Sequence, residues 1–159
     1  MYALKDIQAI ESQPSYKTGE YDYRPWGFYE VLKVGKENNE EFCTKKIGIK
    51  PRKALSLQRH QGRREIWTVE EGTLTVVING IVKTIQKHEH LVVPQSAVHC
   101  MINLMNTPVI VHEKQIGLCH EGDNERLWDM YGRATVAIAA DDYDAQESVK
   151  LYRQIIETL

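Results

Sequence analysis

The segment between residues 28 and 115 alternates short β-type runs with turn signals, and this spacing constrains the fold more than any other feature. Asn79 and Gly80 separate two of the runs, and both residues tolerate the positive φ angles of a tight hairpin turn. Many short strands joined by closely spaced turns are typical of an all-β sandwich or barrel. The predicted strands are Phe28–Val34, Phe42–Lys50, Ala54–His60, Glu65–Glu70, Thr73–Ile78, Ile81–Gln86, His90–Val93, Val98–Asn103 and Val109–Gln115.

The composition is that of an ordinary soluble domain. At 159 residues the chain has room for one domain with its own core, and a formal net charge of −2 gives no reason to expect nucleic acid or a membrane as a partner. No apolar run approaches the roughly twenty residues of a membrane span, and the polar start does not resemble a secretory signal. The three cysteines follow no metal or disulfide spacing, so we expect reduced thiols and a cytoplasmic protein.

We expect the whole chain, residues 1–159, to form a single domain with two different ends. Residues 1–23 are polar and tyrosine-rich, which predicts an extended or lightly helical N-terminal arm. Residues 24–134 form the predicted barrel, and within them residues 117–133 are charged and expected to be irregular.

The pattern of the C-terminal residues predicts a long helix over residues 144–158. Apolar residues recur there at helical spacing, and Asp144 followed by Glu147 fits an N-cap and capping box. We expect this helix to pack on the barrel or on a partner subunit.

Alternation along the strands sorts the side chains into faces, because successive residues point to opposite sides. The predicted inward faces carry apolar residues at one end and polar residues at the other. Such a barrel has a core at one end and a polar mouth at the other. Two faces that show this are Cys43, Lys45, Ile47 and Ile49, and Val109, Val111, Glu113 and Gln115.

Four residues form a candidate metal site. Gln58 and His60 are two apart on one predicted strand, so both can point inward, and Glu65 begins the next strand. His99 arrives on a later strand. Imidazole nitrogen and carboxylate oxygen suit zinc, iron, manganese or nickel, and an amide oxygen can complete the set. The alternative is a barrel that binds no metal tightly.

These segments resemble the two motifs of the cupin superfamily. The second histidine of the usual H-x-H pair is replaced by Gly62, and serine replaces the usual glycine in the second motif. The resemblance implies a jelly-roll β-barrel. The Gln58-x-His60 spacing is similar to the Gln-x-His pair of the longer type of phosphomannose isomerase, and this likeness implies that Gln58 takes the vacant ligand role. The matching residues are His60, Glu65 and Gly72 in the first motif, and Pro94, Ser96, His99 and Asn103 in the second.

The sequence contains four further motifs, in order: Arg24–Gly27, Leu55–His60, Arg63–Trp67 and Asp129–Arg133. Together they resemble the type II mannose-6-phosphate isomerase domain. The match covers about residues 22–134, and it departs from the family at Gly62, at Arg52 and in the segment before Leu127. In the family this domain often follows a mannose-1-phosphate guanylyltransferase, whose nucleotide signature we do not find in this sequence.

The resemblance implies a metal-dependent isomerase that interconverts mannose 6-phosphate and fructose 6-phosphate. Zinc is the first candidate for the divalent metal. The reaction needs a base near the carbon acid, and strand alternation makes Glu113 and Lys45 the candidates. Alternatively, Lys45 pairs with a carboxylate and Glu113 orients another side chain.

A sugar phosphate also needs a cationic clamp, which arginine suits. The candidates are Arg63, Arg126 and Arg133, with Trp67 as a possible sugar contact. Each of them has a purely structural alternative.

Three functions remain open at this stage. The first is the isomerase, expected as a homodimer that supplies GDP-mannose or polysaccharide precursors. The second is a non-catalytic cupin that binds a sugar or nucleotide sugar, with Gly62 marking a degenerate metal site. The third is another metal enzyme on the same fold, such as an epimerase or a dioxygenase, because fold alone does not decide function.

Overall fold

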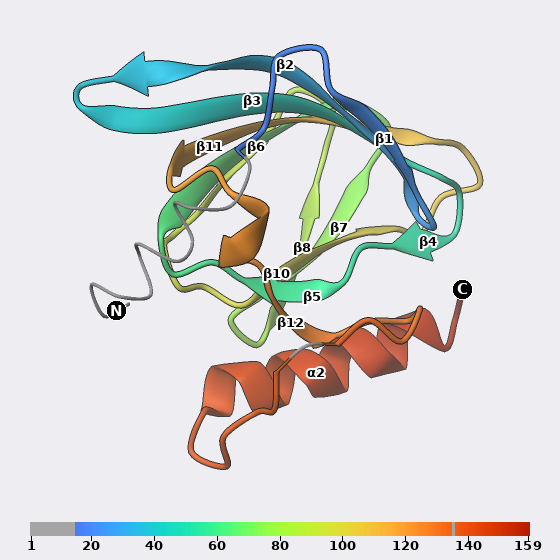
Figure 1. The fold of residues 1–159 in the computed structure, drawn as a ribbon. Helices are drawn as coiled ribbons and strands as arrows, with labels where there is room; N and C mark the ends of the chain where they lie inside the picture. The colour runs from blue at the N-terminus through green and yellow to red at the C-terminus, as the bar shows by residue number, and fades with distance from the viewer. Residues whose placement is uncertain (1–14, 135) are drawn as a thin grey trace.

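The structure is a computed structural model that describes residues 15–134 and 136–159, and it consists of two facing β-sheets with one long helix, α2 (Figure 1). The first sheet is the upper layer in Figure 1. Its strands, in spatial order, are β1 (Tyr21–Arg24), β2 (Gly27–Glu37), β3 (Glu40–Ile49), β11 (Val109–Gly117), β6 (Arg63–Glu71) and β9 (His90–Val93).

The second sheet lies below the first and is also antiparallel. Within the described residues no strand pairing joins the two sheets, so the predicted all-β jelly roll is confirmed as two packed layers whose hydrogen bonding does not close. The strands of this sheet, in spatial order, are β12 (Glu125–Trp128), β5 (Leu57–Arg59), β10 (His99–Asn103), β7 (Leu74–Ile78) and β8 (Ile81–Ile85), with β4 (Lys53–Ala54) pairing with β10.

Most of the predicted strands are present with small shifts of their ends. Asn79 and Gly80 form the expected turn, with φ angles of 43° and 75°. The predicted strand 54–60 is divided into β4 and β5, and Leu55 and Ser56 lie between them and belong to neither strand.

The segment 117–133 is more regular than predicted. It contains a short 3-10 helix, η1 (Glu121–Asp123), and the strand β12, which extends the second sheet at its edge. The prediction failed because β12 is only four residues long and carries charged side chains, so its sequence has no clear alternation.

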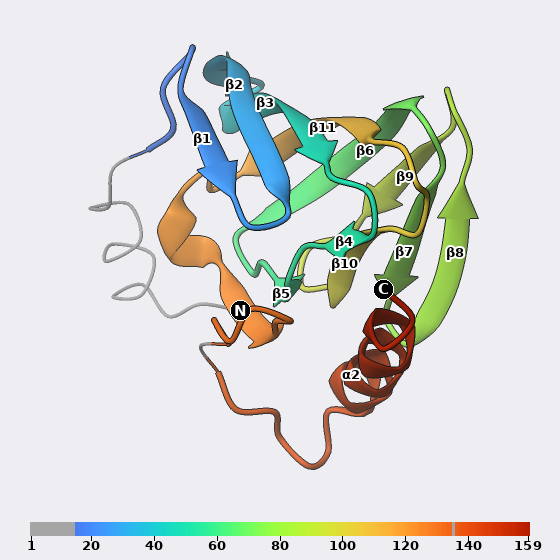
Figure 2. The same cartoon turned by 90° about the vertical axis from the view of Figure 1, so that its right-hand side faces the viewer.

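The C-terminal helix α2 (Tyr143–Ile156) covers the outer face of the second sheet, as both views show (Figure 2). Its Tyr152 and Ala145 are fully buried in a second apolar cluster with Leu57 and Ile102. The predicted N-cap, Asp144, is wrong. Asp142 caps the helix, because its side chain accepts a hydrogen bond from the Ala145 N–H at 3.1 Å while Asp144 already lies in the first turn.

The predicted N-terminal arm falls partly outside the described residues. Where it is described, Ser15 forms an isolated bridge with His120, and Tyr21–Arg24 is the strand β1, paired with β2. None of the described helices has the length and apolar character needed to cross a membrane.

Candidate metal centre

A pocket opens between the two sheets, with about 650 Å³ of empty space including the solvent at its mouth. Apolar side chains such as Ile47 and Met101 form part of its wall. Polar side chains from both sheets and from the loops between strands form the rest. The pocket therefore combines apolar and polar walls.

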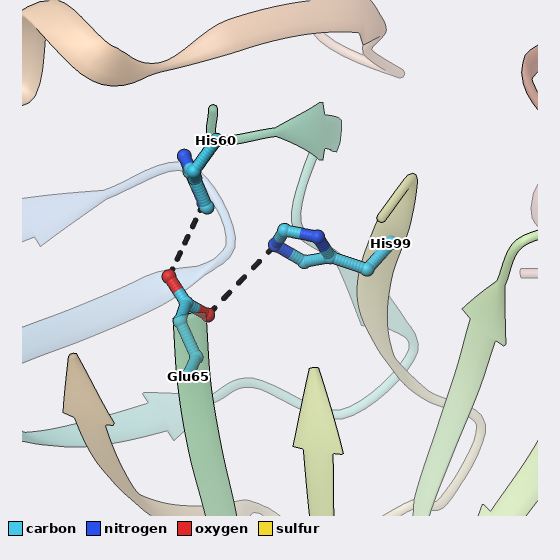
Figure 3. A group of neighbouring side chains, drawn as sticks. All are labelled: His60, Glu65 and His99. Atoms are coloured by element: carbon cyan, nitrogen blue, oxygen red, sulfur yellow. Dashed lines mark ion pairs between the residues drawn. The ribbon is translucent and has the colours of Figure 1, made fainter. Parts of the chain in front are cut away.

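His60, Glu65 and His99 converge in this pocket from three separate parts of the chain (Figure 3). His60 Nε2 lies 3.2 Å from Glu65 Oε1, and His99 Nε2 lies 3.8 Å from Glu65 Oε2. One potential ligand atom from each residue falls within 4.8 Å of the others, and all three side chains are buried. This grouping could hold a metal ion.

Backbone carbonyls fix the orientation of both imidazoles. His60 Nδ1 lies 3.3 Å from the carbonyl oxygen of Asp123, and His99 Nδ1 lies 2.9 Å from that of Ala97. A carbonyl can only accept, so each Nδ1 carries the proton and each Nε2 presents its lone pair toward Glu65. Lone pairs and a carboxylate that face one another can bind a cation between them.

Arg63 places a guanidinium beside these groups. Its Nε lies 3.1 Å from Glu65 Oε1, and its Nη2 lies 3.3 Å from His60 Nε2. The sequence suggested Arg63 as a phosphate ligand, but its guanidinium is buried against the candidate metal ligands. Trp67 is placed similarly: its indole N–H donates to Glu65 Oε2 at 2.8 Å, and its ring packs edge-on to His99.

The electrostatics suit a divalent cation. Burial, with the nearby Arg63 charge, lowers the pKa of His60 well below its usual value, and burial also lowers the pKa of His99. Burial alone would raise the pKa of Glu65, but the neighbouring imidazoles and Arg63 hold it below its usual range. Two neutral imidazoles and one ionised carboxylate are a donor set that zinc and similar metals take, so these residues fit the metal that the sequence implies.

Gln58 lies next to the triad. Its Cα pairs with that of His99 across β5 and β10, and it lines the pocket. The Gln58 Nε2 donates to Ser56 Oγ at 2.8 Å, so Oε1 is the atom that the amide can offer to a metal.

The position of Gly62 differs from what the motif suggested. A Cβ added there would lie 2.6 Å from Leu118 Cδ1, and Gly62 does not line the pocket. A side chain at position 62 would therefore point toward Leu118 and not toward the triad. The Gly62 N–H donates to the Asp123 carboxylate at 3.1 Å, which ties this turn to η1.

Glu113 and Lys45 form the wall beside the triad, on neighbouring strands where their Cα atoms are paired. Burial is the largest cause that raises the pKa of Glu113, to about 7, and the charge of Glu65 adds to it while Lys45 opposes it. The Lys45 ammonium lies 3.3 Å from the centre of the Tyr16 ring and 4.7 Å from that of Tyr29.

Arg126 and Arg133, the other predicted substrate residues, also line the pocket. Arg133 is held by Asp129, with Nε 2.7 Å from Oδ2. Arg24 belongs to the same lining and was not predicted as a site residue.

Three further residues at the site were missed. Tyr16 comes from the polar arm and gave no signal, and Asp123 acts on His60 through a backbone carbonyl that no motif marks. Gln115 could have been found, because it shares the strand face of Glu113.

Comparison with known proteins identifies the family of this chain. A family model described as "Mannose-6-phosphate isomerase C-terminal" matches residues 11–129. The chain is 39% identical over 112 residues to the mannose-1-phosphate guanylyltransferase ManC of Salmonella typhimurium, a match that covers 70% of this chain and 22% of that protein. It is 37% identical over 133 residues to the alginate biosynthesis protein AlgA of Pseudomonas aeruginosa, covering 83% of this chain and 27% of that one. The chain thus spans about a quarter of the length of these relatives.

Solved structures support the fold. An oxalate decarboxylase–formate complex from Lactobacillus farciminis aligns with a TM-score of 0.56 at 16% identity, covering 68% of this chain and 33% of that one. The Cnp3 cupin domain of Schizosaccharomyces pombe aligns with a TM-score of 0.50 at 12% identity, covering 56% and 64%. At these identities the likeness concerns the fold alone. Because the family model matches most of the chain, the chain belongs to the mannose-6-phosphate isomerase C-terminal family and has the cupin fold.

Proposed function

We propose that this protein is a metal-dependent isomerase that interconverts mannose 6-phosphate and fructose 6-phosphate, with zinc as the metal. The observation that carries the proposal is the buried group of His60, Glu65 and His99, which faces a pocket that also contains Glu113 and Lys45. Family membership supports the same reaction. By analogy with the relatives' names, the product would supply mannose phosphates for guanylyltransfer or polysaccharide synthesis.

A divalent ion held by the triad would polarise the sugar carbonyl and the adjacent hydroxyl. Glu113 then acts as the base: its carboxylate removes the C2 proton of mannose 6-phosphate and returns it to C1, while a second proton moves from the C2 hydroxyl to the C1 oxygen. A carboxyl with a pKa of about 7 can both accept and return a proton near neutral pH. Lys45 stabilises the charged form of Glu113, and its own position is fixed between Tyr16 and Tyr29.

The phosphate would bind at the side of the pocket lined by arginines. Arg126 and Arg133 line this pocket, and Arg133 is held by Asp129, whereas Arg63 is engaged by Glu65 and His60. Arginine's planar fork suits a phosphate group. We therefore assign the phosphate to Arg126 and Arg133, and we assign Arg63 to holding the carboxylate of Glu65.

The direct test combines metal analysis with an isomerase assay. Purified protein should contain about one metal per chain and convert mannose 6-phosphate to fructose 6-phosphate, and a chelator should remove both properties. Glu65→Gln should lose metal and activity, whereas Glu70→Gln, an exposed change on the same strand, should lose neither. Protein that remains inactive after zinc, manganese or cobalt is supplied would contradict the proposal.

One observation favours a second candidate, a sugar-binding cupin without catalysis. The Arg63 guanidinium already contacts Glu65 and His60, so it supplies a positive charge that a metal would otherwise provide. Under this alternative the protein binds mannose 6-phosphate when metal-free, and Arg63→Met abolishes that binding. For the isomerase, binding and turnover both require the metal.

A further inference from the structure

Gln115 carries a buried hydrogen-bond acceptor that the fold leaves unused. The residue is on β11, lines the pocket, and is only 1% exposed. Its Nε2 donates to Glu113 Oε1 at 2.6 Å, but among the described residues its Oε1 has no hydrogen-bond partner. Buried polar atoms are nearly always paired, so an unpaired one in a pocket points to a ligand.

The strand register places this amide between the two parts of the site. Gln115 is the Cα partner of Glu65 on β6, whereas Glu113 is the partner of Trp67 on the same strand. On its other side Gln115 pairs with Cys43 of β3, whose thiol donates to the backbone carbonyl of Thr44 at 4.0 Å. The neighbours along the register therefore offer the Oε1 no donor.

We propose that Gln115 Oε1 accepts a hydrogen bond from a hydroxyl of a polyhydroxylated ligand, while its amide NH2 holds Glu113 in place. One side chain then links a hydroxyl of the carbon chain to the carboxylate beside it. In naming a sugar phosphate as the ligand, this inference rests on the proposed function.

The same contact fixes how the ligand lies. Gln115 is the strand partner of Glu65 and its amide NH2 donates to Glu113. Its oxygen can only accept, so it takes a hydrogen bond from a donor such as a hydroxyl and does not bind an anion. The phosphate must therefore lie away from Gln115, toward Arg126 and Arg133. Gln115 thus recognises the carbon chain and sets its position relative to Glu113.

Binding measurements with a non-reactive ligand test this contact separately from catalysis. Mannitol 6-phosphate has no carbonyl and cannot isomerise. Its affinity and those of its monodeoxy analogues are measured by calorimetry on wild-type protein, Gln115→Met and Gln154→Met. Gln154 is an exposed residue of α2, so its variant is the matched control.

We expect one deoxy analogue to bind wild-type protein about tenfold more weakly than the parent compound. In Gln115→Met the parent should weaken by a similar factor, and the same analogue should show no additional loss. This non-additivity distinguishes a direct contact from a general packing effect. If Gln115→Met does not unfold cooperatively, Gln115→Asn, which withdraws the amide by one methylene, replaces it with the same expected result.

Two outcomes overturn the inference. One is that every deoxy analogue loses the same factor in Gln115→Met as in wild-type protein, and the other is that wild-type protein binds no hexitol phosphate. The proposed function fails separately: if the coupling is present but mannose 6-phosphate is not turned over, the Gln115 contact holds and the isomerase assignment is wrong.

Discussion

Two regions that contain buried polar groups differ in how those groups are paired. In the interface between α2 and the second sheet, several polar groups form separate hydrogen bonds or ion pairs. The Tyr152 hydroxyl donates to the Leu55 carbonyl at 2.9 Å, the Gly80 N–H donates to Ser148 Oγ at 2.8 Å, and Arg59 pairs with Asp142 at 2.6 Å.

In the pocket, by contrast, charges are gathered together. Lys45, Arg63, Glu65 and Glu113 are all nearly inaccessible, and the pKa values of Glu65 and Glu113 are shifted in opposite directions. Burying charges costs free energy even when they are paired. The hydrogen bonds of the helix interface therefore stabilise the fold, whereas the buried charges of the pocket destabilise it. Mutations that remove these groups should lower the free energy of unfolding in the interface and raise it in the pocket.

Glu113→Gln should have the largest effect of all the variants. We expect isomerase activity to fall about 10²- to 10⁴-fold, the usual contribution of a general base, because the amide cannot take the C2 proton. Steady-state assays with saturating metal measure this, and Glu37→Gln, an exposed carboxylate on β2, should keep full activity. A variant with less than a tenfold loss would remove Glu113 from the mechanism.

The same variant should be more stable than wild-type protein at pH 8. The pKa of Glu113 rises on folding from its ordinary 4.5 to about 7, so the stability contribution of the protonated form is complete below pH 4.5 and is lost as the pH rises through about 7. Glu113→Gln avoids that loss, which is on the order of 3 kcal/mol. Urea unfolding should show a much larger gain in stability at pH 8 than at pH 5. An equal difference at both pH values would contradict the raised pKa.

The helix interface should respond in the opposite way. Tyr152 is fully buried, so Tyr152→Ala should reduce the free energy of unfolding by about 3–5 kcal/mol, and Tyr152→Phe, which loses only the bond to Leu55, by about 1 kcal/mol. The folded fraction of both variants should bind metal normally. Tyr143→Ala, on the same helix but 79% exposed, is the control with little effect. Loss of metal from folded Tyr152→Phe would mean that the two regions are not separable.

The sequence predicted the parts of this comparison that depend on local spacing. His90–Val93 has the predicted bounds, and the spacing of His60 and Glu65 across one turn was enough to place both in a site. Strand alternation also placed Lys45 and Glu113 on inward faces, because a period of two is set by backbone geometry alone.

The rest depends on contacts between distant segments. No local pattern shows that Tyr16 of the arm packs on Lys45, or that Asp123 orients His60 through its carbonyl. The helix cap was placed two residues late, because Asp142 and Asp144 have the same chemistry and only the backbone geometry distinguishes them. Gln115 lay on a predicted face, but its unpaired oxygen is a property of the packed pocket.

Gly62→His should have a smaller effect, and it tests whether position 62 belongs to the metal site. Although the cupin motif has histidine here, the added side chain would meet Leu118 at 2.6 Å, so we expect unchanged metal affinity and a loss of about 1–3 kcal/mol from overpacking. Adding Leu118→Ala should restore part of that stability. Metal titration and urea unfolding measure the two effects. Tighter metal binding by Gly62→His would show that position 62 can reach the triad.

Substitutions of Arg52 should have the smallest effect on stability, and they test how the interface of α2 is stabilised. Its guanidinium donates to the carbonyls of Leu104 and Thr158 at 2.7 and 2.6 Å, which ties the end of α2 to the loop before β4. Its φ of 59° is in the left-handed region, which costs a non-glycine residue about 1 kcal/mol. Arg52→Ala loses the bonds and keeps the strain, whereas Arg52→Gly loses the bonds and relieves it.

We therefore expect Arg52→Ala to reduce the free energy of unfolding by about 1 kcal/mol and Arg52→Gly to change it by less than half as much. Arg64→Ala, which removes an exposed pair with Glu40, should cost no more than about 0.5 kcal/mol and calibrates the effect of losing a surface arginine. Equal losses in the Ala and Gly variants would show that backbone strain at Arg52 is negligible. The arginine would then contribute through its hydrogen bonds alone, like the other paired groups of the helix interface.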